Sequence, residues 1–133
     1  MTISIITGDH ATIAQLRSAG MGEFVMVDID VSDLPDPATV MGALTGDDPR
    51  VFPAMMSVGG DEVARNATQA CAVARQVAYD NPGSEVTVLV RDDRGRVQAP
   101  AIGGVVAGFL RSVGFDVDIT HTGPVSYTHL RAH

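Results

Sequence analysis

The sequence predicts an α/β fold, built on a small, mostly parallel sheet with flanking helices. The prediction depends first on residues 85–90, a run of β-branched and apolar residues typical of a strand. A polar loop follows at 91–98, and residues 100–113 then repeat apolar side chains at helical spacing. A short alternating strand at 115–120 completes the unit. Because strand–helix–strand units of this length are almost always parallel crossovers, residues 85–120 predict a Rossmann-like βαβ unit.

The N-terminal part of the chain predicts shorter elements of the same kind. A β-branched run at 3–7 indicates a first strand, and residues 11–19 indicate a short helix that ends at Gly20. Residues 24–27 are continuously apolar, which predicts a strand buried on both faces of the sheet. An edge position with one solvated face is expected instead for the alternating strand at 115–120.

The middle of the chain contains one strong helical pattern and one unassigned segment. Asp36 is placed to cap a short helix that begins at Pro37 and ends near Leu44. Residues 50–60 have no clear pattern. Residues 61–79 form the best helix, because small and apolar residues recur every three to four positions on one side.

Composition limits the function classes. The 133 residues suffice for one domain, and a single cysteine excludes both an intrachain disulfide and a cysteine-clustered zinc site. No apolar run approaches the roughly 20 residues that span a bilayer, and no signal pattern opens the chain, so we expect no membrane partner and a cytoplasmic location. Sixteen acidic residues against nine arginines give a net charge of −7, which argues against a nucleic-acid partner.

The final residues, 125–133, differ from the body in composition and pattern. Their letters, VSYTHLRAH, read as one translation frame of a transposase mosaic-end sequencing adapter. We therefore expect one native α/β domain at 1–124 and an artefactual tail at 125–133. The pair His129 and His133 has the spacing of a metal half-site, but the adapter origin makes this interpretation the weaker one.

The loop after the strand at 85–90 is the first candidate site, because ligands of open parallel sheets bind beyond the carboxyl ends of the strands. Guanidinium groups and the N-terminus of the following helix would attract a phosphate or a carboxylate. Gly95 would let the backbone approach such a ligand closely. The alternative is a solvated charged loop with internal ion pairs to Asp92 and Asp93. The residues expected to bind the anion are Arg91, Arg94, Gly95, Arg96 and Gln98.

Other residues are candidates on weaker grounds. His10 follows the first strand and His121 ends the last one, so both could orient a ligand at the same edge, although an ordinary surface role is the simpler interpretation. The acidic residues Asp28, Asp30, Asp33 and Asp36 lack calcium-loop spacing, and we expect no metal site. Cys71 is expected in the core.

The order and spacing of several segments resemble one known family. Thr87 to Val90, the loop, the helix, Gly114 and the terminal His121 follow the layout of the C-terminal domain of the RNase adapter protein RapZ. Upstream, residues 34–37 are similar to the Leu-Pro-Asn-Pro turn of that family, and 44–46 to its Leu-Thr-Gly segment. The resemblance extends loosely over residues 3–121.

Within the loop, the resemblance is confined to Gly95. The positions at which the family has cysteine, histidine, arginine and serine carry Asp92, Val97, Gln98 and Ala99 here, and no Walker A pattern occurs in the chain. The resemblance implies a small-ligand-binding regulatory module whose ligand is an amino-sugar phosphate or a nucleotide. The RNA and RNase partners of the family fit poorly with a charge of −7.

We therefore expect a non-catalytic regulatory module that binds a phosphorylated small molecule at the loop after residues 85–90, without a cofactor. The alternative hypothesis is a protein-interaction or structural module with a decayed ligand site, encoded by a phage or another mobile element. An enzyme ranks third, because no candidate nucleophile lies beside a candidate base. Self-association of the chain stays open at this point.

Overall fold

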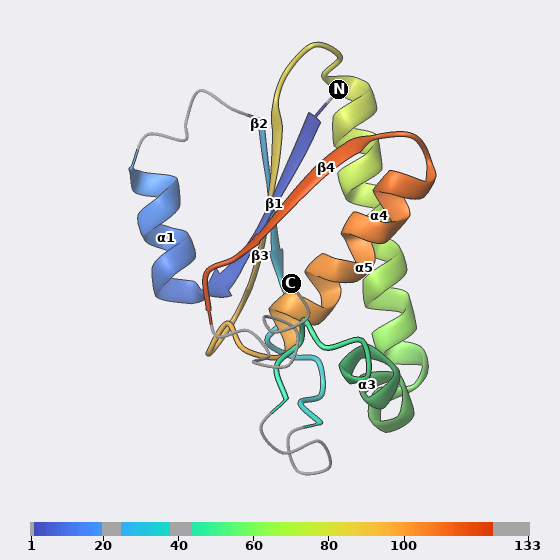
Figure 1. The fold of residues 1–133 in the computed structure, drawn as a ribbon. Coiled ribbons are helices and arrows are strands. Elements are labelled where there is room, and N and C mark those ends of the chain that lie inside the picture. Colours follow the sequence, from blue (N-terminus) through green and yellow to red (C-terminus); the bar gives the residue numbers. More distant parts are fainter. Residues whose placement is uncertain (1, 20–24, 38–43, 124–133) are drawn as a thin grey trace.

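The computed structural model describes residues 2–19, 25–37 and 44–123, and its centre is a four-stranded parallel sheet (Figure 1). All three strand pairings are parallel, and the strands lie in the order β2-β3-β1-β4. The predicted α/β class with a parallel sheet is confirmed. The strands are β1 (Thr2–Asp9), β2 (Val25–Asp30), β3 (Val86–Asp92) and β4 (Asp116–His121).

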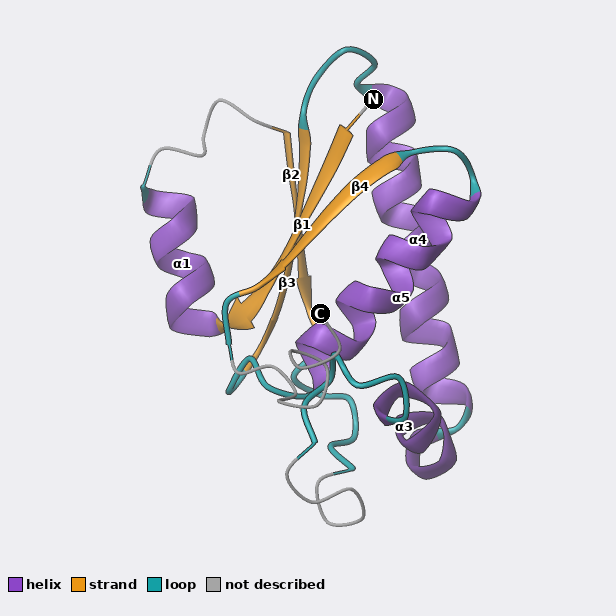
Figure 2. Ribbon diagram, viewed as in Figure 1, coloured by secondary structure: helices purple, strands orange, loops and turns teal. Residues whose placement is uncertain are grey.

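Helices cover the two faces of the sheet unequally, as Figure 2 shows. The short helix α1 (His10–Ser18) lies against one face, where it contacts β1 and β3. The other face is covered by α4 (Asp61–Asp80) and α5 (Gln98–Ser112), and α3 (Val51–Gly59) packs on these two helices. None of the described helices is long and apolar enough to cross a membrane.

The core lies mainly between the sheet and the α4–α5 layer. Ile3 and Ile5 of β1 stand opposite Val86 and Val88 of β3, and all four side chains are buried in this core. The inner strand β3 is buried on both faces. Val86 and Val88 face the α4–α5 layer, whereas Leu89 points to the opposite face of the sheet and is also inaccessible to solvent.

One strand prediction is wrong. β2 was expected to be buried on both faces, but it is an edge strand, and Val27 is the one buried residue within it. The strand also continues into the acidic segment, where Asp28 and Asp30 are exposed. The expected edge position of β4 is confirmed, since Asp116 and Asp118 are exposed and Val117 is buried.

Helix ends follow local capping chemistry. α5 begins at Gln98, two residues earlier than expected, and it ends where Gly114 adopts a φ of 99°. Phe115 N–H donates to the Leu110 carbonyl at 3.0 Å, and Gly114 N–H donates to the Arg111 carbonyl at 3.1 Å, which is a Schellman motif. The predicted glycine stop of this helix is therefore confirmed.

The structure assigns a helix to one segment that the sequence left without a prediction. The unassigned residues 50–60 contain α3, whose Pro53 lies in the first turn, where a missing N–H costs little. The helix expected from Pro37 to about Leu44 falls largely outside the described residues, and Leu44 itself is not helical. The tail expected at 125–133 lies wholly outside the described residues.

Candidate functional site

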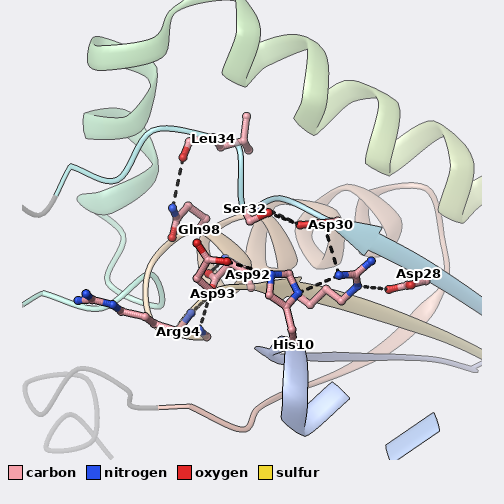
Figure 3. A network of polar contacts seen from close by, with 12 residues as sticks. His10, Asp28, Asp30, Ser32, Leu34, Asp92, Asp93, Arg94 and Gln98 are labelled. Carbon is pink, nitrogen blue, oxygen red and sulfur yellow. Dashed lines mark hydrogen bonds and ion pairs between the residues drawn. The ribbon is translucent and has the colours of Figure 1, made fainter. Parts of the chain in front are cut away.

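The candidate site lies at the carboxyl edge of the sheet, where β1, β3 and β2 end close together (Figure 3). Asp9 ends β1 and stands opposite Asp92, the last residue of β3. Asp30 ends β2 and stands opposite Arg91. Parallel pairing therefore brings residues from three distant parts of the sequence to one edge, as expected for a sheet of this class.

Asp92 organises the loop that follows β3. Its side chain is fully buried, and Oδ1 accepts hydrogen bonds from the N–H groups of Arg94, at 2.9 Å, and of Gly95. Oδ2 accepts the N–H of Ala99, in the first turn of α5, at 2.7 Å. These three N–H groups, which we call the amide cradle, are those that a bound anion would have used. Here the carboxylate of Asp92 takes the place of such an anion.

Gly95 was expected to let the backbone approach a ligand closely, and the structure shows instead a close approach to the backbone of Gly8 and Asp9. Its φ is 66°, a conformation that favours glycine, and a Cβ atom there would lie 2.5 Å from the N of Asp9. Gly123 packs against the Gly95 carbonyl in turn. Gly95 therefore lets the loop pack directly on the end of β1 and on the segment that follows β4.

Arg91 points away from this loop and toward β2. Its Nε donates to Asp28 at 3.0 Å, and its Nη1 lies 3.4 Å from Asp30. The hydrogen bond to Asp28 raises the pKa of Arg91, and the charge of both carboxylates adds to that effect. Hydrogen bonds from Ser32, aided by the charge of Arg91, lower the pKa of Asp30. Arg91 is thus engaged in an internal ion-pair network.

His10 connects this network to the loop. Its Nδ1 lies 2.8 Å from Nη1 of Arg91, and its Nε2 lies 3.1 Å from Oδ1 of Asp93. Because arginine can only donate, Nδ1 is the acceptor, and we assign the proton to Nε2, which donates to Asp93. Both ring nitrogens are therefore in use. His10 is positioned by Asp9, which caps α1 by accepting the Thr12 N–H at 2.7 Å.

The remaining loop residues border a separate hollow of about 330 Å³. Among the described residues, the exposed guanidinium of Arg94 has no hydrogen-bond or ion-pair partner, and Figure 3 shows it directed away from His10. Nε2 of Gln98 donates to the Leu34 carbonyl at 3.2 Å, which ties the loop to the segment after β2. We call this the rim hollow; it is lined by Asp36, Asp93, Arg94, Arg96, Val97 and Gln98.

His121 belongs to a third location. Its Nδ1 lies 2.7 Å from the hydroxyl of the buried Thr7, and its ring borders a hollow of about 320 Å³ beside α5 and residues 46–49. Of the predicted residues, the structure thus brings together Arg94, Arg96 and Gln98. It places Arg91 with His10 in the ion-pair network, and His121 apart from both groups.

The acidic candidates Asp28, Asp30, Asp33 and Asp36 are exposed, whereas Cys71 lies in the core, as expected. Among the described residues, no group of three or more His, Cys, Asp or Glu is arranged to hold a metal ion. Cys71 is buried on the inner face of α4, and this burial raises the pKa of its thiol.

Sequence reasoning missed the structural role of Asp92 and the place of Asp36 and Asp93 in the rim hollow. A usable signal existed for Asp92, because an aspartate just before a glycine-containing turn commonly accepts backbone N–H groups of the following residues. Neither a scan against protein-family models nor a search of curated proteins finds a match to this chain.

Proposed function

We propose that this protein is a non-catalytic α/β module that binds a phosphorylated small molecule in the rim hollow. The observation that carries the proposal is the position of Arg94 and Arg96, whose guanidinium-bearing side chains border one concave site at the carboxyl edge of the sheet. Guanidinium forks match the geometry of phosphate oxygens, and Arg94 has no partner within the described chain. The phosphate seat is therefore the arginine pair and not the amide cradle.

The charges of the rim hollow favour an amino-sugar phosphate over a nucleotide. Asp36 and Asp93 border the hollow together with the two arginines, so the site contains both signs of charge. A ligand that has an ammonium group as well as a phosphate complements such a site, whereas a polyphosphate meets repulsion from the carboxylates. The volume of about 330 Å³ is at the lower end for ligand sites, which also favours a monosaccharide.

The absence of a catalytic role is part of the proposal. No serine, threonine, cysteine or histidine is among the described residues that line the rim hollow, so the lining offers no hydroxyl, thiol or imidazole nucleophile. The resemblance to the C-terminal domain of the RapZ family implies the same class of regulatory, ligand-binding module.

A protein-interaction or structural module with a decayed ligand site is the second candidate. Asp92 favours it, because its buried carboxylate already satisfies the N–H groups of Arg94, Gly95 and Ala99. The engagement of Arg91 by Asp28 and Asp30 has the same implication. Under this hypothesis no phosphate compound binds, although the fold is intact.

Thermal unfolding separates the two candidates. At a ligand concentration ten times Kd, binding adds about 1.4 kcal/mol to the free energy of unfolding, which raises Tm by roughly 4 °C for a domain of this size. We expect this rise with glucosamine 6-phosphate, a smaller one with inorganic phosphate or AMP, and none with glucosamine. A Tm that none of these compounds changes at millimolar concentration would reject ligand binding in favour of the second candidate.

A matched pair of variants localises the effect. Arg94→Gln removes one guanidinium from the rim hollow, and Arg65→Gln removes one from an exposed position on α4 with the same change in net charge. We expect the glucosamine 6-phosphate shift to disappear in Arg94→Gln and to persist in Arg65→Gln. Equal shifts in both variants would show that the ligand binds elsewhere.

A further inference from the structure

A hollow of about 520 Å³ opens to solvent between α3, α4 and α5, the three helices that pack together on one side of the sheet (Figure 1). This volume is within the range of about 300–1,000 Å³ that is typical of clefts for small ligands. α4 forms the floor, where Ala67 and Cys71 are buried. We call this hollow the helix groove; its walls are the half-buried side chains of Phe52 and Met56 from α3 and of Val105 and Phe109 from α5.

Arg75 is the one charged residue among the described residues that line the helix groove. Its guanidinium lies over the ring of Phe109, with 5.5 Å between the guanidinium carbon and the ring centroid. Such a contact uses the face of the guanidinium and leaves the N–H groups in its plane open. Within the described part of the chain, no hydrogen-bond or ion-pair partner takes up these N–H groups. The groove therefore presents a positioned positive charge with open donors beside an apolar surface.

The charge and the apolar surface are arranged along the length of α4. The residues of this helix that line the groove run from Ala64 to Arg75. At a rise of 1.5 Å per residue, these two positions are about 16 Å apart along the helix axis. Met56 belongs to the end at Ala64, because α3 ends at Gly59, just before α4 begins. The groove thus suits a linear molecule that has one charged end and an apolar tail.

The lining selects an anionic end for this molecule. It contains no carboxylate, although the chain has 16 acidic residues against nine arginines. α5 has no aspartate or glutamate at all, and the residues one turn before and after Arg75 on α4 are uncharged. A carboxylate matches the guanidinium fork through two parallel hydrogen bonds, whereas a neutral or cationic end would leave the open N–H groups of Arg75 unused.

A second copy of this chain fits the groove less well. A two-fold contact would place the same face of both copies together, so it would bring to Arg75 another lining without a carboxylate. The groove is concave, and a second copy would need a protruding apolar element to fill it. The most exposed large apolar side chains of the described residues all lie outside the lining; they are Val58, Val73, Tyr79 and Val113.

We propose that the helix groove binds a medium-chain fatty acid, with the carboxylate on Arg75 and the acyl chain along α4 between α3 and α5. The proposal is independent of the rim hollow, since the two sites share no residue. Burial of the acyl chain supplies most of the affinity, at about a fourfold gain in binding for each methylene group. Arg75 supplies the selectivity for the carboxylate.

Isothermal titration calorimetry of the full chain at pH 7 with monomeric decanoate tests the proposal. We expect saturable binding of one decanoate, with a Kd at least tenfold lower than that of decanol or of decylamine, which share its tail. Octanoate, which is two methylene groups shorter, should bind about 15-fold more weakly. Equal Kd values for decanoate, decanol and decylamine would overturn the proposal.

A matched pair of arginine variants tests the role of the charge. Arg75→Gln removes the guanidinium from the helix groove, and Arg65→Gln removes one from an exposed position of α4 outside it. We expect Arg75→Gln to raise the Kd of decanoate at least tenfold and to leave that of decanol unchanged, which reports an intact groove. Arg65→Gln should change neither value. Equal decanoate affinities of the two variants would contradict the assignment of Arg75.

A second pair of variants tests where the tail binds. Ala72→Phe adds a ring at an exposed position of the lining, and Ala14→Phe makes the same change at an exposed position of α1. We expect at least a tenfold loss of affinity for both decanoate and decanol in Ala72→Phe, and no change in Ala14→Phe. Equal affinities of these variants, a dimer of the wild-type chain that Ala72→Phe dissociates, or binding to phosphatidylglycerol vesicles without binding of monomeric decanoate would each overturn the proposal.

Discussion

Removal of the Asp92 carboxylate tests how the loop after β3 is held. Asp92→Ala deletes an acceptor of three backbone hydrogen bonds, and the side chain is fully buried, so no solvent replaces it without rearrangement. The neighbouring Asp93→Ala is the control, because that side chain is 79% exposed and, among the described residues, forms one ion pair, with His10 at 3.1 Å.

The expected cost follows from the surroundings of the three N–H groups. Gly95 and Ala99 are buried, so each loses its acceptor without gaining water, at about 1–3 kcal/mol per group. Arg94 is exposed, and its N–H can be rehydrated at little cost. We therefore expect Asp92→Ala to lower the free energy of unfolding by about 4 kcal/mol, and Asp93→Ala to lower it by less than about 0.5 kcal/mol.

Urea denaturation followed by far-ultraviolet circular dichroism measures both values, since the chain has no tryptophan. Asp92→Asn is a milder variant that keeps one acceptor oxygen but presents a donor where a second acceptor is needed, and we expect about 2 kcal/mol for it. A cost for Asp92→Ala within about 1 kcal/mol of that for Asp93→Ala would refute the reasoning.

Three further predictions follow. Gly95→Ala should destabilise the fold by more than about 2 kcal/mol, because its φ is 66° and its Cβ would meet the backbone of Asp9, whereas Gly104→Ala, in open space within α5, should be neutral or stabilising in the same urea assay. The hydrogen bond from the Thr12 N–H lowers the pKa of Asp9. The stabilisation of the fold by this cap is therefore complete above the ordinary aspartate pKa and is lost as the pH falls through the lowered pKa. The Tm difference between wild type and Asp9→Ala should shrink in acid, and a difference that stays constant would count against the cap. Burial raises the pKa of Cys71, so iodoacetamide should modify the native thiol at least tenfold more slowly than the unfolded one, and equal rates would contradict its placement in the core.

The sequence predicted those parts of the fold that depend on local periodicity. β3, α5 and β4 each have an apolar pattern long enough to define the element, and Gly114 marks the end of α5. The edge position of β2 was not predictable in this way, because strand order depends on which strands pair at long range and not on the apolar content of one run. The helix α3 was missed because its apolar residues are continuous rather than periodic, and Pro53 argues against a helix unless it falls in the first turn.

The sequence predicted where in the fold the candidate residues lie, but not how they are arranged there. The topology of a parallel sheet brings His10, Arg91 and the loop to one edge, as expected. The direction of each guanidinium depends on carboxylates that are distant in sequence, so spacing alone could not separate Arg91 from Arg94. Asp92 counted as a surface charge in the sequence, and only its burial in the structure gives it a backbone-binding role.

The proposed phosphate site is tested most directly by nuclear magnetic resonance of the arginine side chains during titration with glucosamine 6-phosphate. We predict that the Nε–H resonances of Arg94 and Arg96 shift in a saturable way, while those of Arg91, held by Asp28, stay in place. Saturable shifts confined to Arg91, or larger shifts at the amide cradle than at Arg94 and Arg96, would contradict the account.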